Sequence, residues 1–314
     1  MSTPRRPRRS VLFMPGSSPR ALEKARGLPA DAVVLDLEDA VAPDARASAR
    51  AAVAAALAAG GFAPREVVVR VNALETPWFD EDIAMVVAAR ARGAGPDALL
   101  LPKVNDAETL RVVGRRLEAF GVSPALQVWA MIETPIAVLR ALDIALAARS
   151  PVTRLSALVM GTNDLARETG ARIVPGRAPM AGWLSHCVLA ARAGGLDVLD
   201  AVWNDYRDLD GFTRECAEAA EMGFDGKTLI HPTQIAASNA AFAPSPAAVA
   251  DARALVALFD RPENAGKGVV QMEGRMVERL HADMARQTLA LAEAIEARAG
   301  MTRTVPAAER GTGL

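Results

Sequence analysis

Two acidic residues each follow a short, strongly apolar segment, an arrangement that suits the binding of a hard metal ion. Glu133 comes directly after the run Val128–Ile132, which is bounded by prolines and is too short for most helices. Asp164 follows a second such run, Leu155–Val159. Carboxylate ligands without histidine are typical of Mg²⁺, so we expect Glu133 and Asp164 to hold Mg²⁺, with Mn²⁺ as the alternative ion. A second interpretation stays open, in which both acids only cap the helices that follow.

Three basic residues also follow apolar segments, and each has a chemical and a structural interpretation. Arg70 ends a run of three valines, where its guanidinium could hold a substrate carboxylate through two parallel hydrogen bonds. The alternative for Arg70 is an ion pair with Asp36 or Glu38. Lys103 could form a Schiff base, although a lysine at such a place more often pairs with an acid. His231 is either a group of the site or a buried structural histidine.

The segments that would position these residues alternate between strand and helix patterns along the chain. Each apolar segment is followed by a segment with helical periodicity, and the helices expected after the fifth and sixth segments are Ile136–Ala148 and, roughly, Met180–Ala193. The sequence lacks a Gly-rich dinucleotide-binding fingerprint. This order predicts an α/β fold, a (β/α)₈ TIM barrel, in which chemistry is done at the carboxyl ends of the strands. The eight expected strands are Ser10–Met14, Ala32–Leu37, Glu66–Val71, Ala98–Leu101, Val128–Ile132, Leu155–Val159, Asp197–Val202 and Lys227–Ile230.

The pattern changes after the eighth unit. Two further helices are expected at Pro246–Phe259 and Val277–Arg298, and the second has an apolar stripe that must cover another surface. We therefore predict a barrel domain in residues 1–242 and a C-terminal helical extension in residues 243–314. The arginine-rich start of the chain, Met1–Arg9, is expected to be a solvated tail.

Composition excludes several classes of protein. The 314 residues are 51% hydrophobic and 23% charged, with a formal net charge of −1, which gives no general reason to expect nucleic acid or an anionic membrane as a partner. No uninterrupted apolar run approaches the roughly 18 residues of a membrane span. The two cysteines, Cys187 and Cys216, lack the spacing of a zinc site and predict neither metal nor disulfide. We expect a cytoplasmic protein.

Seven motifs, in order along the chain, resemble those of the citrate lyase β-subunit-like family. This family includes malyl-CoA and citramalyl-CoA lyases and belongs to the HpcH/HpaI aldolase superfamily. The resemblance extends from about residue 9 to residue 240, and more weakly to residue 298. The motifs are RSVLFMPG from Arg9, DLEDAV from Asp36, VRVN from Val69, LPKV from Leu101, MIETP from Met131, GTNDL from Gly161 and GKTLIHP from Gly226.

The resemblance implies a Mg²⁺-dependent carbon–carbon lyase. Its substrate would be a 3-hydroxydicarboxylyl- or tricarboxylyl-CoA thioester such as malyl-, citramalyl- or citryl-CoA, cleaved to acetyl-CoA and a 2-oxo acid. The protein would be a homo-oligomer, a trimer or a hexamer. By the same resemblance Glu133 and Asp164 are the metal ligands and Arg70 is a catalytic residue that contacts the substrate. Glu278 is the catalytic acid or base, and stands where the family usually has Asp, one methylene shorter.

Further contacts are expected around these residues. Gly161, Thr162 and Asn163 share a motif with Asp164, and we expect them to bind substrate. The phosphates of CoA need basic residues near the end of the first strand, for which Arg9, Arg20 and Lys24 are the candidates.

Other activities stay open beside the lyase. A malyl-CoA thioesterase or synthase would use related enolate chemistry. Two more distant alternatives are a metal-dependent 2-oxo-acid aldolase that does not use CoA, and a citrate lyase β-type subunit that needs an acyl-carrier partner.

Overall fold

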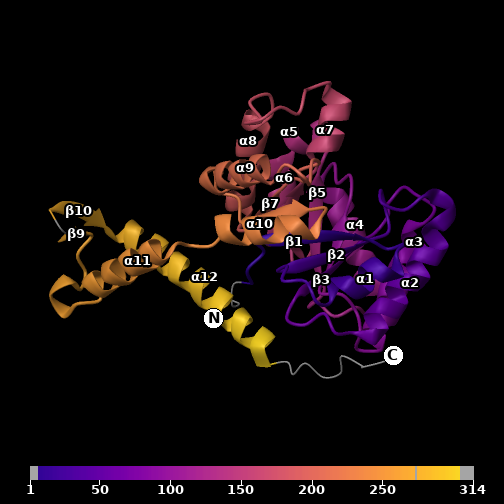
Figure 1. Ribbon diagram of the computed structural model, residues 1–314, viewed down its shortest axis with the longest axis horizontal. Helices are drawn as coiled ribbons and strands as arrows, with labels where there is room; N and C mark the ends of the chain where they lie inside the picture. The colour runs from indigo at the N-terminus through magenta and orange to yellow at the C-terminus, as the bar shows by residue number, and fades with distance from the viewer. Residues whose placement is uncertain (1–5, 273, 305–314) are drawn as a thin grey trace. The chain divides into compact units, whose positions relative to one another are not determined.

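The computed structural model describes residues 6–272 and 274–304, and the chain divides into two compact units (Figure 1). The larger unit is Arg8–Phe242 and contains a closed barrel. The smaller unit comprises the described part of residues 1–7 and 243–314, and contains a helical hairpin with a two-stranded sheet.

Eight parallel strands form the barrel. They pair in chain order from β1 to β8, and β8 pairs with β1 to close the ring. This confirms the TIM barrel, and the predicted strand limits agree with the observed ones to within two residues. The strands are β1 Ser10–Pro15, β2 Ala32–Asp36, β3 Glu66–Arg70, β4 Ala98–Leu101, β5 Gln127–Ile132, β6 Leu155–Met160, β7 Asp197–Asp200 and β8 Gly226–Leu229.

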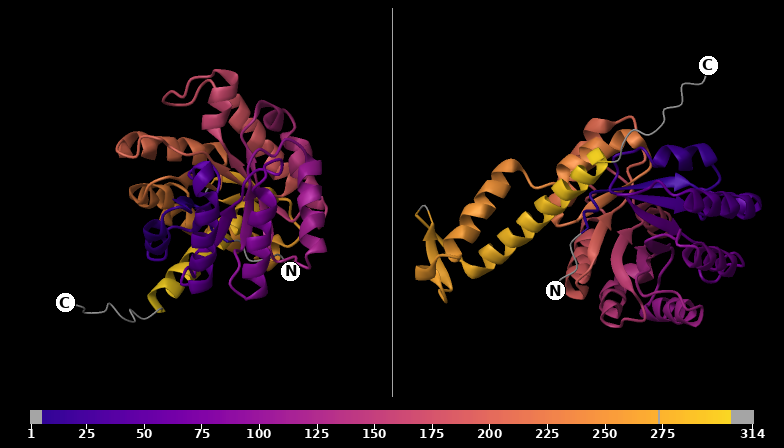
Figure 2. Two further views of the ribbon diagram at one scale, coloured as in Figure 1. Left: turned by 90° about the vertical axis from the view of Figure 1, so that its right-hand side faces the viewer. Right: turned by 90° about the horizontal axis from the view of Figure 1, so that it is seen from below.

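Helices surround the barrel (Figure 2). Several begin at a polar residue whose side chain accepts a hydrogen bond from the first turn, as Ser18, Asp106 and Thr134 do. The helical segments are α1 Pro19–Ala25, η1 Pro43–Ala45, α2 Arg46–Ala59, α3 Phe79–Ala91, α4 Ala107–Ala119, α5 Pro135–Leu139, α6 Ala141–Leu146, η2 Ala147–Arg149, α7 Thr162–Thr169, α8 Ala181–Gly194, α9 Leu209–Met222, η3 Pro232–Gln234 and α10 Ile235–Ala241.

Two helical regions differ from the predicted pattern. Helix α7 was not expected, because its sequence TNDLARET is mostly polar and buries only Thr162 and Leu165. The single helix expected over 136–148 is instead divided into α5, α6 and η2, with Arg140 between the first two in a non-helical conformation. Helix α7 matters for the site because Asp164 lies in its first turn.

Side-chain alternation along the strands decides which residues face the barrel interior. The interior cluster contains Val34 of β2, Val68 of β3, Met131 of β5 and Val159 of β6. Since side chains on one face of a strand recur every second residue, the next inward positions lie at the carboxyl ends of these strands. These positions are Asp36, Arg70, Glu133 and Gly161.

The opposite end of the barrel is closed by an arginine. Arg8 is 9% exposed, and its guanidinium donates two hydrogen bonds of 2.8 Å to Glu66 and one of 2.9 Å to Asp197. The same guanidinium lies over the ring of Trp129, with Cζ 4.6 Å from the centroid. The expectation of a solvated tail over Met1–Arg9 is therefore wrong for Arg8, while residues 1–5 lie outside the described part of the chain.

The C-terminal unit has a core of its own. Helix α11, Pro246–Phe259, packs with the hairpin of β9, Val269–Met272, and β10, Arg275–Glu278. A short η4 turn, Pro262–Asn264, precedes β9, and α12, Arg279–Thr304, follows β10. Phe259, Val270 and Ala282 form the buried centre. The helix expected from Val277 starts two residues later, because Val277 and Glu278 pair in the hairpin.

One stretch, Pro232–Phe259, is long and apolar enough to cross a membrane by length and composition alone. In the structure it is divided into η3, α10 and α11, and residues 242–245 between the last two are not helical. The 14 residues of α11 would extend about 21 Å, which is shorter than the roughly 30 Å hydrocarbon layer. Composition therefore gives only weak evidence of a membrane span here.

Candidate active site

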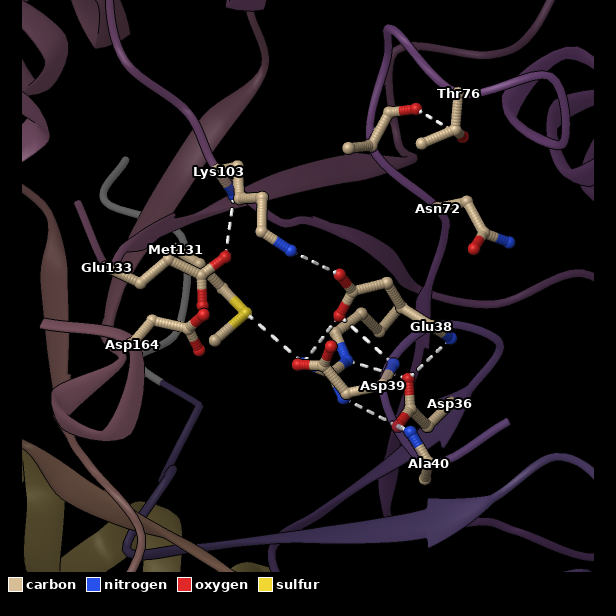
Figure 3. A network of polar contacts seen from close by, with 12 residues as sticks. Asp36, Glu38, Asp39, Ala40, Asn72, Thr76, Lys103, Met131, Glu133 and Asp164 are labelled. Carbon is tan, nitrogen blue, oxygen red and sulfur yellow. Dashed lines mark hydrogen bonds and ion pairs between the residues drawn. The ribbon is translucent and has the colours of Figure 1, made fainter. Parts of the chain in front are cut away.

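The carboxyl groups of Glu133 and Asp164 meet at the mouth of the barrel. Strands β5 and β6 pair with Ile132 opposite Met160, so the residues that follow them begin at the same level. Figure 3 draws the two carboxyl groups side by side, and the charge of Asp164 is one cause of a raised pKa at Glu133. The two predicted metal ligands are thus brought together by strand register and by the first turn of α7.

Glu133 is the more deeply buried of the two acids. It is 1% exposed, and its Oε1 accepts a hydrogen bond of 2.7 Å from the backbone N–H of Lys103. Its Oε2 is buried and has no hydrogen-bond partner within the described residues. Burial, followed by the charges of Asp164 and Glu38, raises the pKa of Glu133 to about 7. A buried oxygen without a partner is costly unless a ligand satisfies it.

Lys103 has an unusual backbone conformation, and its backbone N–H points to Oε1 of Glu133. Its φ of 52° lies in the left-handed region, which costs a residue with a side chain about 1–3 kcal/mol. Its Nζ lies 2.8 Å from Oε1 of Glu38. Burial lowers the pKa of Lys103, but the hydrogen bond and charge of Glu38 outweigh it and leave the pKa raised. A protonated amine paired with an acid is a poor Schiff-base nucleophile, so the ion-pair interpretation is favoured.

Arg70 is held among acids. Asp36 binds it in a bidentate pair, with 2.6 Å from Nε to Oδ1 and 2.6 Å from Nη2 to Oδ2. The third nitrogen, Nη1, lies 3.0 Å from Glu38 and 3.2 Å from Asp39. The ion pair with Asp36, left open by the sequence, is therefore formed. Only Nη1 has a solvent-accessible partner, because the Asp39 side chain is 56% exposed.

Acids outnumber bases in this network. Five acids and three bases of the described residues make up its centre, so the acids exceed the bases by two formal negative charges when all are ionised. Glu168, which lies 3.8 Å from Arg167, adds a third. This excess, together with the unpartnered Oε2 of Glu133, fits a divalent cation. No group of three or more His, Cys, Asp or Glu side chains within residues 6–272 and 274–304 forms a metal site, so water and substrate would complete the coordination. The acids are Asp36, Glu38, Asp39, Glu133 and Asp164, and the bases are Arg70, Lys103 and Arg167.

The residues around Asp164 have different environments. Asp164 itself is 15% exposed at its side chain and pairs with Arg167 at 2.6 Å. Thr162 is buried, whereas Asn163 is part of an exposed reciprocal amide pair with Asn204, at 3.1 and 2.8 Å. Asn163 is therefore the most accessible of the three predicted substrate-binding residues, and Gly161 lies against Glu133.

The three basic residues predicted for CoA do not lie together. Arg20 and Lys24 are exposed on α1, which follows β1 at the mouth side. Arg9 precedes β1, so it lies at the amino-terminal end of the barrel, where it pairs with Asp31 at 2.8 Å. The expectation that Arg9 is near the mouth is not met, because a parallel barrel puts the start and the end of a strand on opposite faces.

Glu278 and His231 were also named from the sequence. Glu278 is exposed and belongs to β10 of the C-terminal unit, where its backbone N–H donates to Nδ1 of His281. His231 is half-buried and caps η3, and its ring stacks on that of Tyr206 with centroids 4.6 Å apart. His231 therefore has a local structural role, and the catalytic role of Glu278 stays a prediction.

One buried charge cluster was not recognised from the sequence. Lys227 of β8 is fully buried, and its Nζ lies 2.6 Å from both Asp200 and Glu215. Arg177 adds contacts of 2.6 Å to Asp200 and 3.4 Å to Glu215. A lysine within the strand motif GKTL was the available signal, since a buried lysine requires acidic partners.

Comparison with known proteins identifies the family of this chain. The model of the HpcH/HpaI aldolase/citrate lyase family matches residues 9–232, which is most of the chain. The chain belongs to this family. The match contains the whole network described above and confirms the resemblance inferred from the seven motifs.

Individual relatives of this family cover nearly the whole chain. A (3S)-malyl-CoA thioesterase of Cereibacter sphaeroides (strain KD131 / KCTC 12085) is 47% identical over 93% of this chain and 96% of its own length. Citrate lyase subunit beta of Escherichia coli (strain K12) is 34% identical, covering 92% and 94% of the two chains. Both are named as enzymes or enzyme subunits, and the chain accordingly belongs to an enzyme family.

A solved structure in this family agrees with the fold. The CitE protein of Mycobacterium tuberculosis, in complex with magnesium, acetoacetate and coenzyme A, is 30% identical to this chain. It superposes with a TM-score of 0.71 over 90% of this chain and 97% of that chain.

Proposed function

We propose that this protein is a Mg²⁺-dependent lyase for a 3-hydroxyacyl-CoA thioester of the malyl-, citramalyl- or citryl-CoA class. The products would be acetyl-CoA and a 2-oxo acid. The observation that carries the proposal is the unpartnered Oε2 of Glu133, which is buried beside Asp164 in a network with excess negative charge. The CitE relative in complex with magnesium and coenzyme A supports the same ligands here.

Glu133 and Asp164 would hold the metal. Mg²⁺ bound there supplies Lewis acidity, which lowers the pKa of a substrate hydroxyl group and stabilises charge on its oxygen. The backbone N–H of Lys103 fixes the orientation of Glu133 through Oε1, which leaves Oε2 for the metal. The Lys103 side chain partly neutralises Glu38, so this acid does not need the ion.

Arg70 would bind an anionic part of the substrate through Nη1. Its other two nitrogens are occupied by Asp36, which also accepts hydrogen bonds from the backbone N–H groups of Glu38 and Ala40. A substrate carboxylate or enolate oxygen would replace the exposed carboxylate of Asp39 beside Nη1. This arrangement gives Arg70 a fixed direction and one accessible donor.

In net terms the proposed reaction moves one proton, from the substrate hydroxyl oxygen to the carbon of the thioester enolate, and breaks one carbon–carbon bond. The substrate hydroxyl loses its proton, the bond between the carbinol carbon and the CH₂ beside the thioester breaks, and its electron pair forms the thioester enolate. The carbinol carbon becomes the carbonyl carbon of the 2-oxo acid. The enolate carbon then receives a proton, for which Glu278 stays the proposed donor on the resemblance alone.

The CoA phosphates would bind Arg20 and Lys24. Both side chains are exposed on α1, close in sequence to the mouth end of β1. Arg9 is not kept in this role, since Asp31 already pairs with it at the other end of the barrel.

Thioester hydrolysis is the second candidate function. It is favoured by the 47% identical relative named (3S)-malyl-CoA thioesterase. The two reactions are distinguished by their products, since hydrolysis of malyl-CoA gives malate and free CoA, whereas the lyase gives acetyl-CoA and glyoxylate.

Product analysis tests both candidates. Purified protein is incubated with malyl-, citramalyl- and citryl-CoA, with either Mg²⁺ or EDTA, and the products are separated by chromatography. We expect turnover with Mg²⁺ and none with EDTA, and loss of turnover in Glu133→Gln and Asp164→Asn. Full activity in either variant would disprove the metal assignment. Inactivation by borohydride with substrate, together with indifference to EDTA, would instead indicate a Schiff base at Lys103.

The same assay addresses the remaining alternatives. Turnover of free 2-oxo-acid aldols but not of CoA esters would indicate the CoA-independent aldolase. Activity only with an acyl-carrier protein would indicate a citrate lyase β-type subunit, as the 34% identical relative is named. We also keep the homo-oligomer, the cytoplasmic location and the lack of nucleic-acid or membrane partners as parts of the proposal.

A further inference from the structure

Gly161 occupies an inward-facing position directly beside Glu133. It follows the last residue of β6, and its N–H donates a hydrogen bond of 3.1 Å to the carbonyl of Ile132 on β5. Its φ of −117° lies outside the left-handed region that favours glycine. The backbone conformation therefore does not require glycine, so the reason for glycine must be sought in the space around it.

That space is filled by the proposed metal ligand. A Cβ built on Gly161 would lie 2.4 Å from Cβ and 2.8 Å from Oε2 of Glu133. The closer atom is the root of the Glu133 side chain, so a rotamer change cannot relieve the contact. The backbone is also restrained, because β5 and β6 pair without interruption at their carboxyl ends, from Trp129 opposite Ala157 to Ile132 opposite Met160. Oε1 of Glu133 is in addition held by the N–H of Lys103. Any side chain at 161 must therefore displace Glu133.

We infer that Gly161 is a positioning residue, whose missing side chain lets the Glu133 carboxylate lie across the end of β6 toward Asp164. This role replaces the substrate contact expected from the sequence. The inference rests on the proposed function, in which these two acids hold Mg²⁺. It predicts that one added methyl group weakens metal binding before any substrate is present.

The first test measures binding of Mg²⁺ alone by calorimetry. We expect the dissociation constant of Gly161→Ala to rise by about 10- to 100-fold, as for other changes that misorient a metal ligand. Glu133→Gln serves as the variant with a broken site. Gly182→Ala is the matched control, because Gly182 lies in α8 with no atom within 4 Å of the added Cβ, and its affinity should equal that of the wild type.

A second test does not depend on metal. If the methyl group acts through Glu133, its effect on the melting temperature should shrink once that side chain is removed. Gly161→Ala is therefore compared in the wild-type background and in the Glu133→Gly background, as a double-mutant cycle. We expect a clear loss of melting temperature in the first background and a smaller one in the second.

The outcomes separate this inference from the proposed function. Wild-type protein that does not bind Mg²⁺ would disprove the proposed function and the inference with it. Equal Mg²⁺ affinity of wild type and Gly161→Ala would disprove the inference alone, as would equal losses of melting temperature in the two backgrounds.

Discussion

Two charged networks in the barrel unit differ in how their charges are compensated. In the network of Asp200, Glu215, Arg177 and Lys227, each of the four carboxylate oxygens lies within 3.4 Å of a cationic nitrogen. At the mouth, Oε2 of Glu133 has no such partner among the described residues. The acids of the first network are therefore compensated without a ligand, and in this sense the network is complete. The buried atoms in it that lack a hydrogen-bond partner among the described residues are Nε and Nη2 of Arg177, which are donors and cannot bind a cation. The network joins β7, β8 and α9. The second is incomplete, which is typical of a site that binds a cation.

Pairing within the protein also explains why both networks are tolerated. Buried charges are costly alone, and their cost falls when opposite charges and hydrogen bonds surround them. Burial raises the pKa of Glu133 to about 7, whereas the pKa of the fully buried Asp200 is lowered, since Lys227 and Arg177 outweigh the effect of its burial. Burial by itself raises the pKa of both carboxyl groups, and the neighbouring charges decide whether the pKa is finally raised, as at Glu133, or lowered, as at Asp200.

The largest expected effect comes from breaking the complete network. Lys227→Met should lower the free energy of unfolding by about 3–5 kcal/mol, because Asp200 and Glu215 would keep one cationic partner for two buried charges. Urea denaturation followed by circular dichroism measures this loss. Lys24→Met on the exposed face of α1 is the control and should change stability by less than about 0.5 kcal/mol.

Removing a charge from the incomplete network at the mouth should lower activity and leave stability intact. Glu133→Gln should lower turnover by about 10²-fold or more, because the substrate oxygen loses metal stabilisation. Its unfolding free energy without metal should not fall, since the uncompensated buried charge is gone. Turnover and urea denaturation are measured on the same preparation, with Glu108→Gln, at an exposed position of α4, as the control. A variant as destabilised as Lys227→Met would contradict the contrast between the networks.

A smaller effect is expected at the partner of Arg70. Asp36→Asn keeps the shape of the side chain but weakens the bidentate pair, so Arg70 loses its fixed direction. We expect turnover to fall about tenfold, less than the 10²-fold that a 1 Å displacement can cost, with unchanged Mg²⁺ affinity. Asp44→Asn in η1 is the exposed control. A loss of Mg²⁺ affinity in Asp36→Asn would show that Asp36 acts on the metal site.

The pH dependence of Mg²⁺ binding sharpens the comparison further. A proton on Glu133 competes with the metal, so a pKa of about 7 predicts that affinity rises about tenfold from pH 6 to pH 8. Calorimetry at several pH values, in buffers of different ionisation enthalpy, would also detect the released proton. An affinity that is constant over this range would contradict the assignment of Glu133 as a ligand.

The stability of the metal-free protein should change with pH in the opposite direction to its Mg²⁺ affinity. In metal-free protein the pKa of Glu133 is raised from 4.5 to about 7, so folded protein binds the proton more tightly than unfolded protein does. Its contribution to the free energy of unfolding is complete below about pH 4.5 and is lost as the pH rises through about 7. Wild type should therefore lose stability relative to Glu133→Gln over this interval, as measured by urea denaturation at each pH.

Much of the scaffold was predictable because it depends on local periodicity. Short apolar segments separated by helical patterns predicted all eight strands, and parallel pairing placed Glu133 and Asp164 at one end. Helix α7 was not predicted because it is short and polar. The β9–β10 hairpin was not predicted because its strands, VVQM and RMVE, are mostly exposed and neither is a continuous apolar run. Arg9 was misplaced because it precedes its strand, which puts it on the other face of the barrel.

The sequence by itself determined the barrel, the family and the two acids at neighbouring strand ends, since these follow from patterns along the chain. Only the tertiary structure decided that Asp36 occupies two nitrogens of Arg70, that the Lys103 amide orients Glu133, and that Gly161 makes room for it. These contacts join residues about 30 positions apart. They depend on strand register and closure of the barrel, which no local pattern contains.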